Sequence, residues 1–165
     1  MTVKTKAAFV LGTWFGSGKA PAAPGTFGSL AALPFGWAIL HFGGACWLAA
    51  AAVAVCFIGV WSAGVVMRET NTEDPGMIVI DEVVGQWLAL LCVPADWIGY
   101  LLAFALFRVF DISKPWPACW ADSKLRNATG VMLDDVFAGL YALLCAALLT
   151  HYVMPDGGWL NLFAK

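Results

Sequence analysis

The sequence predicts an all-α protein, a single membrane-embedded domain (1–165) built as a polytopic bundle of about five apolar helices. Its hydrophobic content of 61% exceeds the roughly 45–50% of soluble domains. Only 12% of its residues are charged, and the apolar residues gather in long segments separated by short polar stretches. The net charge of −2 argues against a nucleic-acid partner, because a nucleic-acid binder normally carries a basic patch.

Five apolar segments follow one another along the chain. The segment 45–66 is the clearest spanning helix, because a bilayer core needs about 20 apolar residues. Segments 78–93 and 97–110 are short for spanning; flanking turns extend them, or they form a hairpin packed among the other helices. Asp96 precedes the fourth segment and can cap its first turn. The five segments are 27–43, 45–66, 78–93, 97–110 and 134–153.

The positive charges of the chain indicate its orientation in a membrane. Five spans with a cytoplasmic N-terminus would place the first three of the four polar stretches on the cytoplasmic side. Eight of the nine Lys and Arg residues lie in or beside those three stretches, and only Lys165 falls outside. This is the positive-inside bias. The four stretches are 1–26, 67–77, 111–133 and 154–165.

Two acid pairs, Asp81–Glu82 and Asp134–Asp135, interrupt apolar runs that read IVIDEVVGQWLALL and VMLDDVFAGLYALL. We expect each pair to begin a helix, with a small residue one turn later (Gly85 and Ala138) that lets helices approach closely. The similarity of the two runs is either an internal repeat or chance between Ala/Leu-rich helices.

The acid pairs have two interpretations. A carboxylate at a helix N-terminus is stabilised by the helix dipole, which would explain one acid per helix. Adjacent acids repel each other, however, and two pairs at one membrane face can share a cation. Magnesium is the natural candidate, because it takes hard oxygen ligands and often binds one or two carboxylates together with a substrate phosphate.

A third polar motif, RVFDISKPWP, spans residues 108–117. Arg108 and Asp111 lie three residues apart, on one helical face, and Lys114 follows just before a proline that stops the helix. The motif is either an Arg–Asp ion pair at the membrane surface or a metal-binding carboxylate with two cations for a phosphate.

Two polar loops are weaker candidates. The loop KAPAAPGTFGS (19–29) can cradle an anion with its backbone amides, Lys19 and Thr26, or it is an ordinary connection between helices. The loop RETNTEDPGM (68–77) is most simply a solvated segment, although Asp74 is near enough to the first acid pair to join a metal site.

The motifs together resemble the phosphatidylglycerophosphatase A family of bacterial membrane phosphatases. The resemblance covers most of 15–145 and rests on four stretches in the order and spacing of the family. Where the family usually has a Gly-Gly pair before the second acid pair, this chain has Asn127-Ala128-Thr129-Gly130. The stretches are FGSGKAPAAPGTFGSLAALP, DPGMIVIDEVVGQW, FRVFDISKPWP and TGVMLDDVFAGLYA.

The resemblance implies magnesium-dependent hydrolysis of the terminal phosphate of phosphatidylglycerophosphate, a step of phospholipid synthesis at the bacterial inner membrane. The positive-inside orientation places the active site on the cytoplasmic side. The catalytic residues are then Asp81, Glu82, Asp111, Asp134 and Asp135; the metal ligands are Asp81, Asp111, Asp134 and Asp135, with Asp74 a further candidate; and the phosphate-binding residues are Lys114, Arg108, Lys19 and Thr26.

Three points stay open at this stage. The attacking group is either a metal-bound water or an aspartate that forms a covalent intermediate. A small transporter or channel component is the main alternative, because acids inside a membrane often mark ion paths; such acids should lie in mid-helix. A structural subunit of a membrane complex would leave the acid pairs unexplained. The oligomeric state is not predicted.

Overall fold

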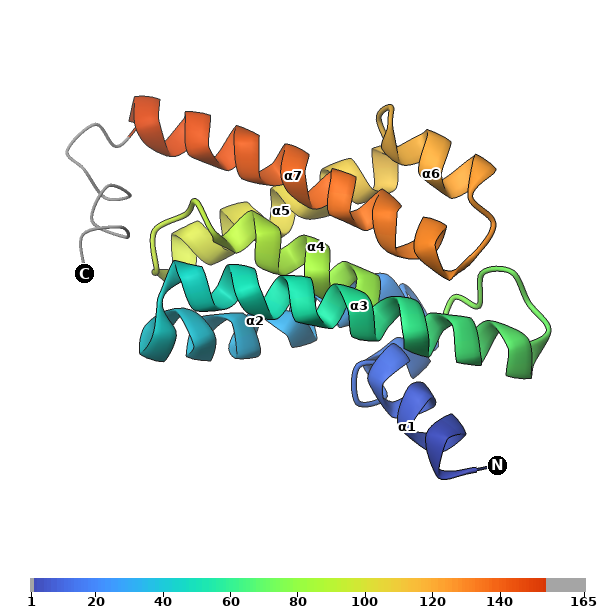
Figure 1. Ribbon diagram of the computed structural model, residues 1–165. Coiled ribbons are helices and arrows are strands. Elements are labelled where there is room, and N and C mark those ends of the chain that lie inside the picture. The colour runs from blue at the N-terminus through green and yellow to red at the C-terminus, as the bar shows by residue number, and fades with distance from the viewer. Residues whose placement is uncertain (1, 154–165) are drawn as a thin grey trace.

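The structure, a computed structural model, describes residues 2–153. In that part of the chain it contains seven α-helices and one 3-10 helix and no β-strand, so the all-α prediction is confirmed. Figure 1 shows their arrangement. The helices are α1 (Val3–Gly12), α2 (Pro24–Gly43), α3 (Ala45–Thr70), α4 (Ile80–Leu90), α5 (Trp97–Ser113), α6 (Ala118–Lys124) and α7 (Ala128–Val153), and the 3-10 helix is η1 (Ser17–Lys19).

Local side chains fix several helix ends. Asp96 Oδ1 accepts a hydrogen bond of 2.7 Å from the backbone N–H of Gly99, which confirms the predicted cap of α5. At its other end, α5 stops at Lys114, which adopts a left-handed conformation (φ 42°) just before Pro115. The carboxamide oxygen of Asn127 accepts hydrogen bonds of 3.0 Å from the N–H groups of Thr129 and Gly130, at the start of α7.

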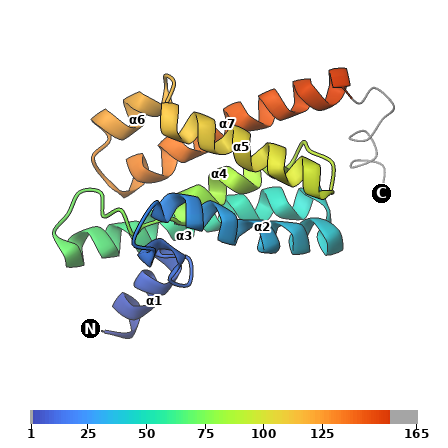
Figure 2. The same cartoon turned by 180° about the vertical axis from the view of Figure 1, so that it is seen from behind.

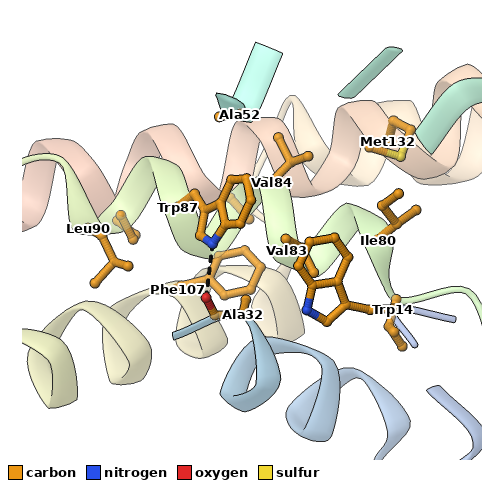
Figure 3. Packing of buried hydrophobic residues seen from close by; sticks show 14 of the residues in the cluster. Trp14, Ala32, Ala52, Ile80, Val83, Val84, Trp87, Leu90, Phe107 and Met132 are labelled. Carbon is orange, nitrogen blue, oxygen red and sulfur yellow. Dashed lines mark hydrogen bonds between the residues drawn. The ribbon is translucent and has the colours of Figure 1, made fainter. Parts of the chain in front are cut away.

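The helix α4 lies at the centre of the bundle. It contacts α2, α3, α5 and α7, and in Figures 1 and 2 it runs between α3 on one side and α5 and α7 on the other. Figure 3 shows its apolar side chains, Ile80, Val84 and Trp87 among them, packed in the core. Trp87 Nε1 donates a hydrogen bond of 3.0 Å to the carbonyl oxygen of Ala32 in α2.

Glycines let α4 and α7 pack closely. A Cβ added to Gly139 would lie 2.7 Å from the carbonyl oxygen of Gly85, and one added to Gly85 would lie 2.7 Å from the carbonyl oxygen of Asp135. The close approach predicted at Gly85 is therefore present. Its partner on α7 is Gly139, with the fully buried Ala138 beside it.

All five predicted apolar segments are helical, but a bundle of five membrane-crossing helices is not confirmed. Within residues 2–153, only α3 and α7 are long and apolar enough to cross a membrane. The helix α4 has 11 residues, which at about 1.5 Å per residue makes it about 16 Å long, against a bilayer core of about 30 Å. The polar stretch predicted at 154–165 lies outside the described residues.

One predicted helix start is wrong. The helix α7 begins at Ala128, six residues before the predicted start of the fifth segment, because Asn127 supplies the cap. Asp134 and Asp135 therefore lie in the second turn of α7 and not at its N-terminus, whereas Asp81 and Glu82 do occupy the first turn of α4.

Candidate active site

A cavity of about 430 Å³ opens where α4 begins, where α5 ends and where α7 completes its first turns. Gly25 of α2 and the loop between α3 and α4 form its other walls. The helix α4 is short and buried among its neighbours. Its first turn, which carries Asp81 and Glu82, therefore lies against the neighbouring helices. Eight of the predicted site residues line the cavity: Asp74, Asp81, Glu82, Arg108, Asp111, Lys114, Asp134 and Asp135.

Three of these acids form a compact group. Asp81, Glu82 and Asp135 each offer a carboxylate oxygen, and the three oxygens lie within 4.8 Å of one another. Asp81 and Asp135 are buried, and Glu82 Oε2 is buried with no hydrogen-bond partner among the described residues. Buried anions this close repel one another unless a cation or protons neutralise them. Such a group of oxygen ligands suits magnesium.

The remaining two acids of the motifs are held by cations. Arg108 Nη1 donates to Asp111 Oδ2 across one turn of α5, which is the ion pair of the first interpretation of this motif. Lys114 Nζ lies 2.7 Å from Asp134 Oδ2 and 2.6 Å from Asp122 Oδ1, so this ammonium bridges two helices. The cavity therefore has an acidic centre with an arginine and a lysine at its edge.

Lys114 keeps its charge in this position. Its partial burial acts to lower the pKa, but the hydrogen bonds to Asp122 and Asp134 and the attraction of the two carboxylates outweigh burial and raise the pKa above its ordinary value. The left-handed conformation that ends α5 directs this side chain toward α7. Lys114 is thus a fixed cation at the cavity wall at neutral pH.

The start of α2 closes the cavity from the opposite side. A Cβ added to Gly25 would lie 2.1 Å from Glu82 Oε1 and 3.2 Å from Arg108 Nη1, so a larger residue here would displace the Glu82 carboxylate. The Pro/Gly-rich loop therefore contributes to the site through the close backbone approach of Gly25.

Two predicted phosphate-binding residues lie elsewhere. Among the described residues, neither Lys19 nor Thr26 lines the cavity. Thr26 follows Gly25 in the first turn of α2, and Lys19 lines a separate groove beside α1. Their binding of substrate stays a prediction.

Asp122 and Arg126 line the cavity, although sequence reasoning did not propose them as site residues. Asp122 binds Lys114, and Arg126 Nη1 lies 3.5 Å from Glu73 Oε2 in the loop before α4. The sequence feature that could have indicated these two residues is their position in the polar stretch 111–133, which also contains Lys114. Nothing in the local sequence shows that the stretch folds back over the acids.

Comparison with protein families is decisive for the identity of this site. The family model described as "Phosphatidylglycerophosphatase A" matches residues 10–150, and so covers every acid of the cavity. The chain belongs to the phosphatidylglycerophosphatase A family. It is therefore a lipid phosphatase by family, as the motifs predicted.

Individual relatives agree with this assignment. The chain is 36% identical over 132 residues to phosphatidylglycerophosphatase A of Escherichia coli (strain K12), covering 79% of this chain and 76% of that protein. It is 38% identical over 147 residues to phosphatidylglycerophosphatase A of Haemophilus influenzae, covering 88% and 90%. A Bacteroides thetaiotaomicron protein named "Putative phosphatidylinositol-3-phosphatase" is 42% identical over 147 residues, covering 84% and 91%. No solved structure shows significant similarity to the chain.

Proposed function

We propose that this protein removes the terminal phosphate of phosphatidylglycerophosphate, with magnesium as cofactor, to give phosphatidylglycerol and inorganic phosphate. The observation that carries the proposal is the cavity in which acids from α4, α5 and α7 meet Arg108 and Lys114. Membership of the phosphatidylglycerophosphatase A family supports the choice of a lipid phosphate as substrate.

The carboxylates fit a magnesium ion. Asp81, Glu82 and Asp135 would hold it, because their oxygens already lie close together and Glu82 Oε2 has no hydrogen-bond partner within residues 2–153. This set differs from the sequence-based one in including Glu82, while Asp111 and Asp134 are each bound by a cation. When bound, magnesium would polarise the phosphoryl group and offset its negative charge.

The cations at the cavity edge would bind and orient the phosphate. Arg108 and Lys114 are each held by a carboxylate and retain further N–H donors for the non-bridging oxygens. Arg108 Nε is buried with no partner in the described part of the chain, so one donor of its guanidinium is free. The attacking group is a water molecule or an aspartate, and trapping of a phosphoenzyme would distinguish the two.

The substrate would reach this cavity from a membrane. The helices α3 and α7 are long and apolar enough to span a bilayer. Figure 1 shows the loop after α3 and the helix α6 at the same end of the bundle. Residues of both line the cavity. We propose that this end faces the cytoplasm at the bacterial inner membrane, since eight of the nine Lys and Arg residues lie in or beside the polar stretches 1–26, 67–77 and 111–133.

Purified protein in detergent, assayed for phosphate release from phosphatidylglycerophosphate with and without magnesium, tests the proposal. Asp81→Asn and Asp134→Asn should each abolish release with the helical content unchanged. Asp96→Asn is the matched control, because it makes the same change at the far end of α5 and asparagine caps a helix as well as aspartate does. Wild-type turnover in both site variants would show that the site is elsewhere.

Phosphatidylinositol 3-phosphate belongs in the same assay. The relative from Bacteroides thetaiotaomicron bears a name for that substrate and is 42% identical to this chain. A higher rate with the inositol lipid would show that the proposed substrate is wrong, although the proposed active site would stand. The transporter alternative finds no support in the comparisons, whose names are all those of phosphatases.

A further inference from the structure

A second, separate groove lies beside α1. Its larger part, about 550 Å³, is lined by Lys6, Phe9, Val10, Lys19 and Met77. An adjoining hollow of about 240 Å³ shares three of these residues and extends the groove to Phe15. Neither part includes a residue that lines the active-site cavity.

The groove carries two unneutralised positive charges. Lys6 and Lys19 are exposed, and neither forms an ion pair with any residue in 2–153. In the described part of the chain, no acidic residue lines either part of the groove. Two lysines facing one hollow without a carboxylate attract an anion such as a phosphate group.

The rest of the groove is apolar and open. The side chain of Val10 is 49% exposed and that of Phe15 is 61% exposed. Phe15 stacks on Phe35 of α2 at 5.9 Å between ring centroids, so the groove continues into the exposed apolar face of α2. A ligand that satisfies both parts of the groove has an anionic phosphate and a hydrocarbon chain.

The backbone is strained where the groove ends. Trp14 and Phe15 have φ values of 42° and 57°, and Gly16 follows at 95°. Large non-glycine side chains rarely adopt this left-handed conformation, because it brings Cβ too close to the backbone. The turn keeps Trp14 buried and Phe15 exposed beside Lys19. Strain of this kind is characteristic of binding sites.

The loop segment 76–79 separates the groove from the active site. Gly76 and Ile78 line the active-site cavity, whereas Met77 between them lines the groove. This segment is held against the end of α1, because Val79 N donates a hydrogen bond of 2.9 Å to the carbonyl oxygen of Gly12. A Cβ added to Gly18 would also lie 2.1 Å from the carbonyl oxygen of Met77. The groove therefore lies behind the segment that leads into the catalytic acids.

We propose that this groove is a second binding site for an anionic phospholipid, distinct from the catalytic cavity. Lys6 and Lys19 bind the phosphodiester, and Val10, Phe15 and Phe35 contact an acyl chain. The inference rests on the proposed membrane location and goes beyond the phosphatase activity. A phospholipid bound here would contact the segment that contains Met77, which separates the groove from the active-site cavity.

Native mass spectrometry in a neutral detergent measures lipid binding to this site. The full-length protein is titrated with phosphatidylglycerol and, separately, with phosphatidylcholine. Lys6→Gln and Lys19→Gln should each weaken phosphatidylglycerol binding about fivefold, the order expected for one lysine against an anionic headgroup. Lys4→Gln is the matched control, because it removes the same charge from α1 at an exposed position outside the groove.

A photoactivatable analogue of phosphatidylglycerol locates the bound lipid independently of the variants. The crosslink should map to residues 7–19 in the wild-type protein, and Lys6→Arg, which keeps the charge, should retain it. Equal weakening by Lys4→Gln and Lys6→Gln, crosslinks confined to the catalytic cavity, or equal binding of phosphatidylcholine would each overturn the proposal. Displacement of the lipid by millimolar inorganic phosphate would overturn the assignment to a phospholipid in favour of a free phosphate. Loss of activity in Asp81→Asn with the lipid still bound would separate this site from the catalytic one.

Discussion

Replacing Gly85 by alanine should destabilise the contact between α4 and α7 and with it the active site. The added Cβ would lie 2.3 Å from Phe107 Cε2 and 2.7 Å from the carbonyl oxygen of Asp135. The phenyl ring of Phe107 can turn only slightly, because Phe107 is fully buried, and the carbonyl belongs to the backbone of α7. The helices must therefore move apart at the level of Asp135.

Two effects of opposite sign set the magnitude. Alanine is favoured over glycine inside a helix by about 1 kcal/mol. Forcing an extra methyl group into a packed core costs about 1–3 kcal/mol, and more where the obstacle is backbone. We expect the free energy of unfolding to fall by about 1–2 kcal/mol. Since Asp81 and Asp135 face each other across this contact, we expect phosphate release to fall at least tenfold.

Gly64→Ala is the control for this experiment. It makes the same change within α3, where the added Cβ would lie 3.5 Å from Ala128 Cβ, an ordinary contact. Its stability should be equal to or higher than that of the wild type, by up to about 1 kcal/mol. Thermal unfolding followed by circular dichroism in detergent, together with phosphate release, compares the two variants. Wild-type stability and activity in Gly85→Ala would refute the close packing of α4 on α7.

Three further predictions concern charge, burial and capping. Lys114→Met should lower the free energy of unfolding by about 1–3 kcal/mol in thermal melts, because it leaves the buried Asp134 without its cation. Lys114→Arg should recover part of the loss, and equal melting temperatures for the two variants would contradict this. Gln86→Met should raise stability by about 1 kcal/mol, because the fully buried amide of Gln86 has no partner among the described residues; a fall would indicate that the amide is hydrogen-bonded, for example to water. Asp96→Ala should lower the unfolding free energy by about 1 kcal/mol through the lost cap of α5, with phosphate release unchanged.

Much of this architecture could be predicted from local sequence. Segments rich in apolar residues became helices, Asp96 caps α5 and Pro115 follows its end, because each signal acts over a few neighbouring residues. The ion pair of Arg108 and Asp111 also follows from their spacing on one helical face. Such features need no knowledge of the tertiary structure.

Most of what sequence reasoning missed depends on tertiary packing. One exception is the start of α7, which lies six residues earlier than predicted because Asn127 caps the helix locally. Asp122 meets Lys114 only because α6 folds back beside α7. The selection of Asp81, Glu82 and Asp135 as the compact group depends on the register of α4 against α7, which a single sequence does not specify.

The position of α4 has a consequence for how the enzyme is made. At 11 residues it is too short to enter the lipid phase alone, and the acids it carries meet their counterparts on α7, the last helix of the described chain. While the ribosome is still synthesising the protein, α4 has neither its full packing nor its acidic partners. Catalytic competence is therefore gained only after translation has passed α7, and a chain released before that point holds half of an active site.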